Sequence, residues 1–156
     1  MSIAGKLSAF LEDHGVGFEV VPHAPAATSS RTAQAAHVPG ARLAKAVLVE
    51  DPKHCSVVVV PATEQLHLGE LRRELGNTYA LATEEEVERI FADCDLGSVP
   101  AFGQAYGLEV LVDDSLLEQE RVYVESGDRA ALLAIDGDDF RRLMKDARRG
   151  RYGHPS

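Results

Sequence analysis

The 156-residue chain has no tryptophan, and its aromatic residues are limited to five phenylalanines and four tyrosines. Proteins that bind long single-stranded nucleic acids stack successive bases on aromatic side chains, so an extended platform of that kind is not expected. Basic residues are also in the minority, because 16 Lys and Arg stand against 25 Asp and Glu and give a net charge of −9. This charge disfavours non-specific binding of long nucleic acids, which requires clustered cations.

Cysteine and long apolar runs are scarce as well. The two cysteines, Cys55 and Cys94, lie far apart and form neither a disulfide framework nor a C-x-x-C zinc motif, which suits a reducing cytosol. No apolar run approaches the roughly 20 residues that span a bilayer. The first 15 residues turn acidic early and read as an amphipathic helix rather than a signal peptide. We therefore expect a cytoplasmic protein without a membrane partner.

The common signatures of catalysis are missing too. The chain contains no P-loop, no dinucleotide-type glycine-rich turn, no H-E-x-x-H and no G-x-S-x-G. None of its six histidines stands at a convincing metal-binding distance in sequence from another ligand, so no metal and no cofactor is expected. Cys94 lies between Asp93 and Asp95, whose charges disfavour a thiolate and make it a poor nucleophile.

The patterns that are present predict alternating helices and strands. Periodicity and capping residues predict helices at 2–14, 28–37, 66–75, 83–92 and from 138 onward. Apolar, β-branched runs predict strands at 18–21, 43–49, 56–60, 79–82, 108–112, 121–125 and 131–135. Hairpins mixed with intervening helices predict an α+β fold with a mixed, mainly antiparallel sheet. The length fits one domain, expected over residues 1–149, and residues 150–156 are expected to form a disordered tail.

One charged residue interrupts an otherwise apolar strand. Lys45 lies within residues 43–49, where alternation puts it on one face with Val47 and Val49. A lysine in such a strand is costly unless it reaches solvent or meets an anion. Both interpretations stay open from the pattern alone.

A loop rich in glycine and proline covers residues 97–103. Its glycines allow backbone N–H groups to converge on an anion or an oxyanion, and Pro100 would stiffen the loop. The alternative is an ordinary connecting turn. A second polar feature is the basic cluster, whose cations would bind an RNA tip or simply favour a helix C-terminus. This cluster comprises Arg141, Arg142, Lys145, Arg148, Arg149 and Arg151.

These segments occur in a recognisable order. A stretch from His23 to Thr28 before a small helix is followed by the lysine-bearing strand 43–49, the G-x-x-P loop 97–103, and the closing segment 125–140. In order, spacing and context this set resembles the YbaK / prolyl-tRNA synthetase insertion-domain family of aminoacyl-tRNA deacylases. The order and spacing of these motifs make the resemblance specific, and it covers about residues 2–145.

The resemblance implies a compact α+β domain with a mixed, partly barrel-like sheet. It also implies hydrolysis of the ester that joins a non-cognate amino acid to the 3′-terminal ribose of tRNA. We therefore expect a free-standing, trans-editing aminoacyl-tRNA hydrolase for a small amino acid, with tRNA(Pro) as the expected class. The partners it implies are the 3′ acceptor end of aminoacyl-tRNA and an aminoacyl-tRNA synthetase. The amino acid, the need for a synthetase, and the oligomeric state (monomer or homodimer) stay open.

The resemblance also implies roles for particular residues. Lys45 would meet the terminal phosphate or the ester, and backbone N–H groups of the loop would stabilise the developing oxyanion. The nucleophile stays open between water, a ribose hydroxyl and a substrate thiol. The catalytic assignments are Lys45, Gly97, Ser98, Val99 and Pro100, and the substrate-binding assignments are His23, Thr28, Ala101, Phe102, Gly103, Asp128 and Arg129.

Some of these residues have plainer interpretations. His23 can also be a loop histidine, and for Thr28 a helix cap is an equally good interpretation. For Asp128 and Arg129 an exposed turn pair is the slightly favoured interpretation. Two departures from the family bear on specificity. The segment 130–134 is apolar where several members carry a polar residue, and Ala46 replaces a residue that is polar in some members. The amino acid removed is set by such positions.

Two other functions remain open from the sequence. One is a non-catalytic module of the same fold that binds an aminoacyl or nucleotide end. The other is a hydrolase of a different small acyl ester. Loss of turnover in Lys45→Ala distinguishes a catalyst from a binding module, and dependence on intact tRNA distinguishes the two hydrolases.

Overall fold

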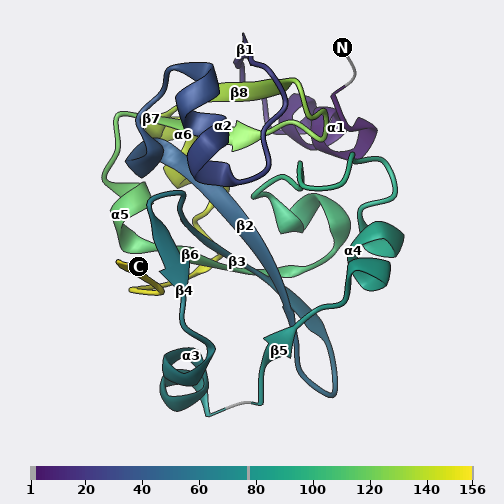
Figure 1. The fold of residues 1–156 in the computed structure, drawn as a ribbon, viewed down its shortest axis with the longest axis vertical. Coiled ribbons are helices and arrows are strands. Elements are labelled where there is room, and N and C mark those ends of the chain that lie inside the picture. Colours follow the sequence, from purple (N-terminus) through teal and green to yellow (C-terminus); the bar gives the residue numbers. More distant parts are fainter. Residues whose placement is uncertain (1–2, 77, 156) are drawn as a thin grey trace.

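A mixed β-sheet with short helices around it forms the framework of the computed structural model, which describes residues 3–76 and 78–155 (Figure 1). The helices are α1 (Gly5–Asp13), α2 (Ser29–Ala36), α3 (Leu68–Leu75), α4 (Glu84–Ile90), α5 (Asp114–Leu117) and α6 (Gly137–Leu143), with 3-10 turns η1 (Gly40–Arg42) and η2 (Gly103–Tyr106). The strands are β1 (Glu19–Pro22), β2 (Leu43–Glu50), β3 (Cys55–Pro61), β4 (Glu64–Leu66), β5 (Ala80–Leu81), β6 (Glu109–Asp113), β7 (Arg121–Glu125), β8 (Ala131–Asp136), β9 (Arg148–Gly150) and β10 (Gly153–Pro155). The predicted α+β class is confirmed.

The main sheet has the strand order β1-β8-β7-β2-β3-β6-β9, with β5 paired to the end of β2. The pairs β2–β7, β3–β6 and β6–β9 are parallel, and the other four pairs are antiparallel. Figure 1 shows β2 running diagonally through the molecule, with α2 beside its upper half and β5 at its lower end. The β2–β3 hairpin puts Lys45 opposite Val60. β2 therefore connects the two halves of the sheet.

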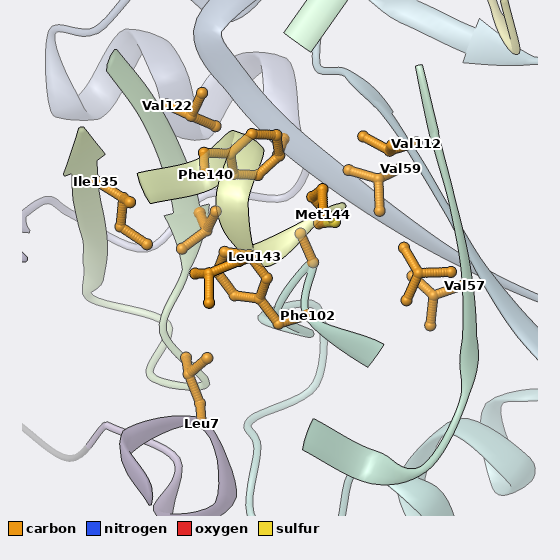
Figure 2. Close-up of a cluster of buried hydrophobic side chains, with 14 of the residues drawn as sticks. Leu7, Val57, Val59, Phe102, Val112, Val122, Ile135, Phe140, Leu143 and Met144 are labelled. Atoms are coloured by element: carbon orange, nitrogen blue, oxygen red, sulfur yellow. The ribbon is translucent and has the colours of Figure 1, made fainter. Parts of the chain in front are cut away.

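A large apolar cluster fills the space between the sheet, α1 and α6 (Figure 2). Phe102 lies at its centre, with its ring centroid 5.6 Å from that of Phe10 and 5.8 Å from that of Phe140. Val57 and Val59 of β3 close one side of the cluster. Full burial of a Val, Leu, Ile, Phe or Met side chain stabilises the folded state by about 1.5–3 kcal/mol.

Helix ends follow the expected capping chemistry. The Thr83 hydroxyl accepts a hydrogen bond from the Glu86 N–H, while the Glu86 carboxylate accepts one from the Thr83 N–H, so the predicted capping box begins α4. The Thr28 hydroxyl accepts from the Arg31 N–H at 3.2 Å and begins α2. Gly76 ends α3 in the left-handed conformation.

The expected disordered tail is wrong for residues 150–155, while Ser156 lies outside the described residues. Strand β9 pairs with β6, and β10 pairs with β4, a strand that the helical prediction for 66–75 had not anticipated. The physical reason lies in Asp113, whose carboxylate accepts hydrogen bonds from the N–H groups of Tyr152 at 2.8 Å and Gly153 at 2.7 Å. These contacts and the burial of Tyr152 hold the segment in place.

Candidate functional site

A cleft of about 910 Å³ runs along β2 between α2 and α4. Its floor includes Lys45 and Val47 of β2, and one wall carries Thr28 and Ser29 at the start of α2. The exposed leucines Leu81 and Leu96 also line it, and each has more than half of its surface in solvent. Large apolar side chains exposed around a cleft are typical of a binding surface.

A smaller side pocket of about 210 Å³ adjoins this cleft, and the two share six lining residues. The shared residues are Ser29, Lys45, Ala46, Val87, Leu96 and Gly97. The side pocket adds Glu84, Val99 and Glu125. Drug-sized ligands fill sites of about 300–1,000 Å³, so the side pocket suits a smaller group.

Lys45 is half-buried where the two cavities meet. Its Nζ donates a hydrogen bond to the backbone carbonyl oxygen of Glu64 at 2.6 Å. Burial lowers the pKa of the Lys45 ammonium below its usual value, because the charged form loses hydration. A carbonyl neutralises no charge, so this cation keeps the capacity to bind an anion or a polarised ester.

The glycine- and proline-containing loop supplies backbone donors beside Lys45. Gly97 adopts a φ of +83°, a conformation that favours glycine. The Ser98 N–H donates to the Asp95 carbonyl at 3.1 Å, whereas the N–H groups of Gly97 and Val99 have no acceptor among the described residues. Gly97 lines both cavities and Val99 lines the side pocket. Two unpaired N–H donors therefore adjoin the cavities.

Asp95 links this loop to the turn that joins β7 to β8. Its N–H donates to the Gly127 carbonyl at 2.7 Å, and its carboxylate accepts from the Arg129 N–H at 3.1 Å. Gly127 has a φ of +91°, and a Cβ there would lie 2.6 Å from that of Ala4. The linkage brings Arg129 to the cleft, where its side chain is exposed.

Glu125 is a site residue that sequence reasoning missed. It ends β7, lines the side pocket and is only 7% exposed. Burial raises the pKa of its carboxyl to about 7. In the sequence, Arg121, Tyr123 and Glu125 alternate with apolar residues and therefore predict the polar, solvent-facing side of a strand. No local signal indicates that Glu125, the last residue of this strand, is buried instead.

Five of the predicted site residues are buried away from both cavities. Ala101 and Phe102 are fully buried in the apolar cluster, and a Cβ on Gly103 would lie 2.8 Å from a methyl of Val57. These three residues line neither cavity, and their apolar surface holds the loop on the core, so their substrate-binding role stays a prediction. Ser98 and Pro100 are also buried and line neither cavity.

The remaining predicted residues divide between the cleft and its surroundings. Thr28 caps α2, as its cap interpretation predicts, and it also lines the cleft, where its role in substrate binding stays a prediction. His23 lines neither cavity, and its Nδ1 contacts the Ala24 carbonyl oxygen at 2.8 Å. Asp128 accepts a hydrogen bond from the Ala130 N–H at 2.8 Å and also lies outside both linings.

Neither cysteine is placed for nucleophilic chemistry. Burial raises the pKa of the Cys94 thiol to about 12, and the charges of Asp93 and Asp95 add to the effect. Burial likewise raises the pKa of Cys55, which packs against the apolar cluster. The sequence expectation for Cys94 agrees with this geometry, although burial is the larger cause.

Several cations of the basic cluster are engaged within the fold. Arg141 donates to the Leu117 carbonyl at 2.8 Å and pairs with Asp138. Arg142 donates to the His14 carbonyl and pairs with Asp139. Arg149 lies 3.6 Å from Asp114. These contacts favour the structural interpretation of the cluster over an RNA-binding one.

In the part of the chain that the structure describes, two groups of side chains have the spacing to hold a metal ion. His67, Glu70 and His154 place one ligand atom each within 4.8 Å of one another, as do Glu50, Cys55 and Glu86. Sequence spacing could not reveal the first group, because it forms only when β10 pairs with β4. Both groups lie outside the linings of the cleft and the side pocket.

Comparison with known proteins gives a consistent picture. The family described as the aminoacyl-tRNA editing domain matches residues 23–143. A crystal structure of a protein proposed to be a trans-editing enzyme for prolyl-tRNA synthetase superposes with a TM-score of 0.81 at 26% identity, covering 97% of this chain and 96% of that one. A scaffold from a study of epitope backbone grafting gives 0.81 at 25% identity, with 97% of each chain covered.

The same fold also occurs within a longer protein. In a protein from Marinobacter aquaeolei VT8 proposed to act in signal transduction, 97% of this chain matches 31% of that chain, with a TM-score of 0.80 and 21% identity. A search of curated proteins returned no match. Within the described residues, no helix has the length and apolarity that crossing a membrane requires.

Proposed function

This chain belongs to the aminoacyl-tRNA editing domain family, and we propose that it hydrolyses the ester of a small, wrongly attached amino acid on tRNA. The reaction would act in trans on charged tRNA, as the similarity to a proposed trans-editing enzyme for prolyl-tRNA synthetase suggests. On the same ground we take tRNA(Pro) as the first substrate class to test.

The observation that carries this proposal is the position of Lys45 between the cleft and the side pocket. An ester at the 3′ end of tRNA joins a large polyanion to a small acyl group. The large cleft would hold the terminal nucleotide, with Leu81 and Leu96 against its base, and the side pocket would hold the amino acid. Lys45 lines both cavities and would therefore lie at the junction between the two parts of the substrate.

Catalysis would come from stabilising charge that develops at the ester carbonyl. The unpaired N–H groups of Gly97 and Val99, together with the Lys45 ammonium, are donors of the kind that stabilise a tetrahedral oxyanion. The nucleophile would be water or a group of the substrate itself, for which positioning in a confined pocket is the main requirement. Arg129, which also lines the cleft, would contact a tRNA phosphate.

Selectivity would be mainly steric. Ala46, Val87 and Val99 narrow the side pocket, so an amino acid with a larger side chain would be excluded. One methylene of difference between two competing substrates changes the free energy of discrimination in an apolar pocket by about 1–3 kcal/mol. We therefore expect alanine, serine and cysteine to be accepted more readily than larger residues.

The test is deacylation of labelled Ala-, Ser- and Cys-tRNA(Pro) by the wild type, Lys45→Ala and Lys53→Ala. Lys53 is an exposed lysine in the β2–β3 turn and serves as the matched control. We expect hydrolysis of at least one substrate, a fall of about 100-fold or more in Lys45→Ala, and no change in Lys53→Ala.

Three outcomes would contradict the proposal. If Lys45→Ala retained full activity, the reaction would not use this cation. If the wild type bound charged tRNA without hydrolysing any member of the panel, the domain would be a binding module rather than a catalyst. Equal hydrolysis of small aminoacyl esters and of charged tRNA would point to a different ester as the substrate.

A further inference from the structure

Glu125 is a buried carboxyl group that has no partner in the fold. Its side chain is 7% exposed and lines the side pocket, and within residues 3–76 and 78–155 nothing forms a hydrogen bond or an ion pair with it. An ionised carboxylate in such surroundings is costly unless a cation or donors compensate it. The raised pKa of Glu125 reflects this cost, and a ligand that carries a cation would relieve it.

The charged groups around the pocket do not supply it. Lys45 directs its Nζ to the Glu64 carbonyl oxygen, and the other ionisable residue of the lining, Glu84, carries the same sign of charge as Glu125. The β8 residue opposite Glu125 is Leu132, and the neighbouring Val124 is buried in the apolar cluster. No cation compensates the Glu125 carboxylate within the described residues, so a cationic group on the occupant of the pocket would favour its charged form.

We propose that Glu125 binds the free α-ammonium group of the aminoacyl ester, so that the substrates of this site are esters of unblocked amino acids. This inference rests on the proposed function and adds the chemical group that is recognised. In an aminoacyl ester the α-ammonium is separated from the reacting carbonyl carbon by a single carbon atom. A carbonyl held by the Gly97 and Val99 donors would leave the ammonium within the same small pocket as Glu125.

The inference has a consequence for specificity. An N-acetylated aminoacyl-tRNA carries no α-ammonium, and an initiator or peptidyl species is blocked in the same way. Such a substrate would leave the Glu125 carboxylate unpaired in the pocket, and sites that leave a buried polar group unpaired reject the analogue strongly. The protein would therefore spare blocked aminoacyl-tRNAs while hydrolysing free ones.

The experiment compares Ala-tRNA(Pro) with N-acetyl-Ala-tRNA(Pro) as substrates for the wild type, Glu125→Gln and the exposed control Glu12→Gln. We expect the wild type and the control to prefer the unblocked substrate by about 10- to 100-fold, the range given by a hydrogen bond to a charged group. Glu125→Gln should lose that factor on Ala-tRNA(Pro) and change little on the acetylated substrate. Equal losses on both substrates would overturn the inference and make Glu125 a general base.

A binding measurement separates this inference from the hydrolytic function. Alaninamide has the ammonium but no ester, and it can be titrated while the carboxyl of Glu125 is followed by NMR. We expect the pKa of Glu125 to fall from about 7 as alaninamide saturates the site, because a nearby cation favours the carboxylate. N-acetylalaninamide should produce no fall. Binding with this signature but without deacylation would refute the proposed function alone, whereas deacylation with no shift would refute the ammonium site alone.

Discussion

The carboxylate of Asp95 accepts a hydrogen bond from the backbone N–H of Arg129 at 3.1 Å. Because Asp95 also begins the loop that carries Gly97, this bond fixes the loop and the β7–β8 turn relative to each other. The two segments lie more than 30 positions apart in sequence, and their contact determines the shape of one wall of the cleft.

The first prediction concerns this linkage. Asp95→Ala removes the acceptor and should lower kcat/KM for deacylation by about tenfold or more, because small displacements of catalytic donors are costly. Asp95→Asn keeps an oxygen acceptor and should retain most of the activity. Steady-state kinetics on both variants, with circular dichroism to confirm folding, tests the idea. Equal activity in Asp95→Ala and the wild type would show that the Asp95–Arg129 hydrogen bond does not contribute to catalysis.

A second prediction follows from the buried carboxyl of Glu125. Its folded-state pKa of about 7 lies above the ordinary value, so between about pH 5 and pH 8 the folded state releases a proton that the unfolded state has already lost. Stability should therefore fall as pH rises through 7, by an amount on the order of 2 kcal/mol. Glu125→Gln should lack this fall and be the more stable protein at pH 8. Urea unfolding of both proteins at pH 5 and pH 8 measures the difference, and parallel pH profiles would contradict it.

The third prediction concerns Asp113, whose side chain fixes the C-terminal segment. Burial alone would raise the pKa of Asp113, but hydrogen bonds from Gly153, Ser115 and Tyr152 outweigh it and the pKa is lowered. This carboxylate therefore stabilises the fold above its ordinary pKa of about 3.9 and loses that effect as pH falls through the lowered value. Asp113→Ala should cost about 2 kcal/mol or more at pH 7. In urea titrations the difference in the free energy of unfolding between wild type and Asp113→Ala should become smaller below about pH 4. A difference that does not change with pH would refute this explanation.

Phe102 provides the fourth prediction, because the sequence assigns it to the substrate site whereas the structure buries it in the apolar cluster. Phe102→Ala should lower the free energy of unfolding by about 3–5 kcal/mol, as for other buried aromatics. The milder Phe102→Leu should fold and leave KM for charged tRNA within about twofold, since its side chain lines neither cavity. A large rise in KM without loss of stability would restore it to the binding site.

Much of the fold was predictable because its signals are local. Thr83 and Glu86 are three residues apart and form the capping box that their types predict. The alternation around Lys45 likewise predicted which neighbours share its face, because period two is a property of a single strand. What could not be predicted depends on partners distant in sequence. The β4–β10 pairing joins segments almost 90 positions apart, and without it the residues from 150 onward read as a polar tail.

The candidate site divides in the same way. Lys45 was visible because a charge in an apolar run is anomalous within its own segment. Glu125 could not be identified from the sequence, because a glutamate at the end of a strand is common. Its role becomes visible only in the structure, where β7 pairs with β2 and Glu125 lines the side pocket. Phe102 is close to Gly97 in sequence but lines neither cavity, because the chain turns into the core between the two residues.

The carbonyl oxygen that accepts the Lys45 hydrogen bond belongs to Glu64, at the start of β4, and β4 pairs with β10 in a separate two-stranded sheet. Short two-stranded sheets open locally at a lower free energy than the central strands of a larger one. Each opening of the β4–β10 pair would displace the Glu64 carbonyl and release the Lys45 ammonium from its resting contact. The exchange of the Gln65 and His154 amide hydrogens with deuterium would therefore report how often the cation is free to meet a substrate.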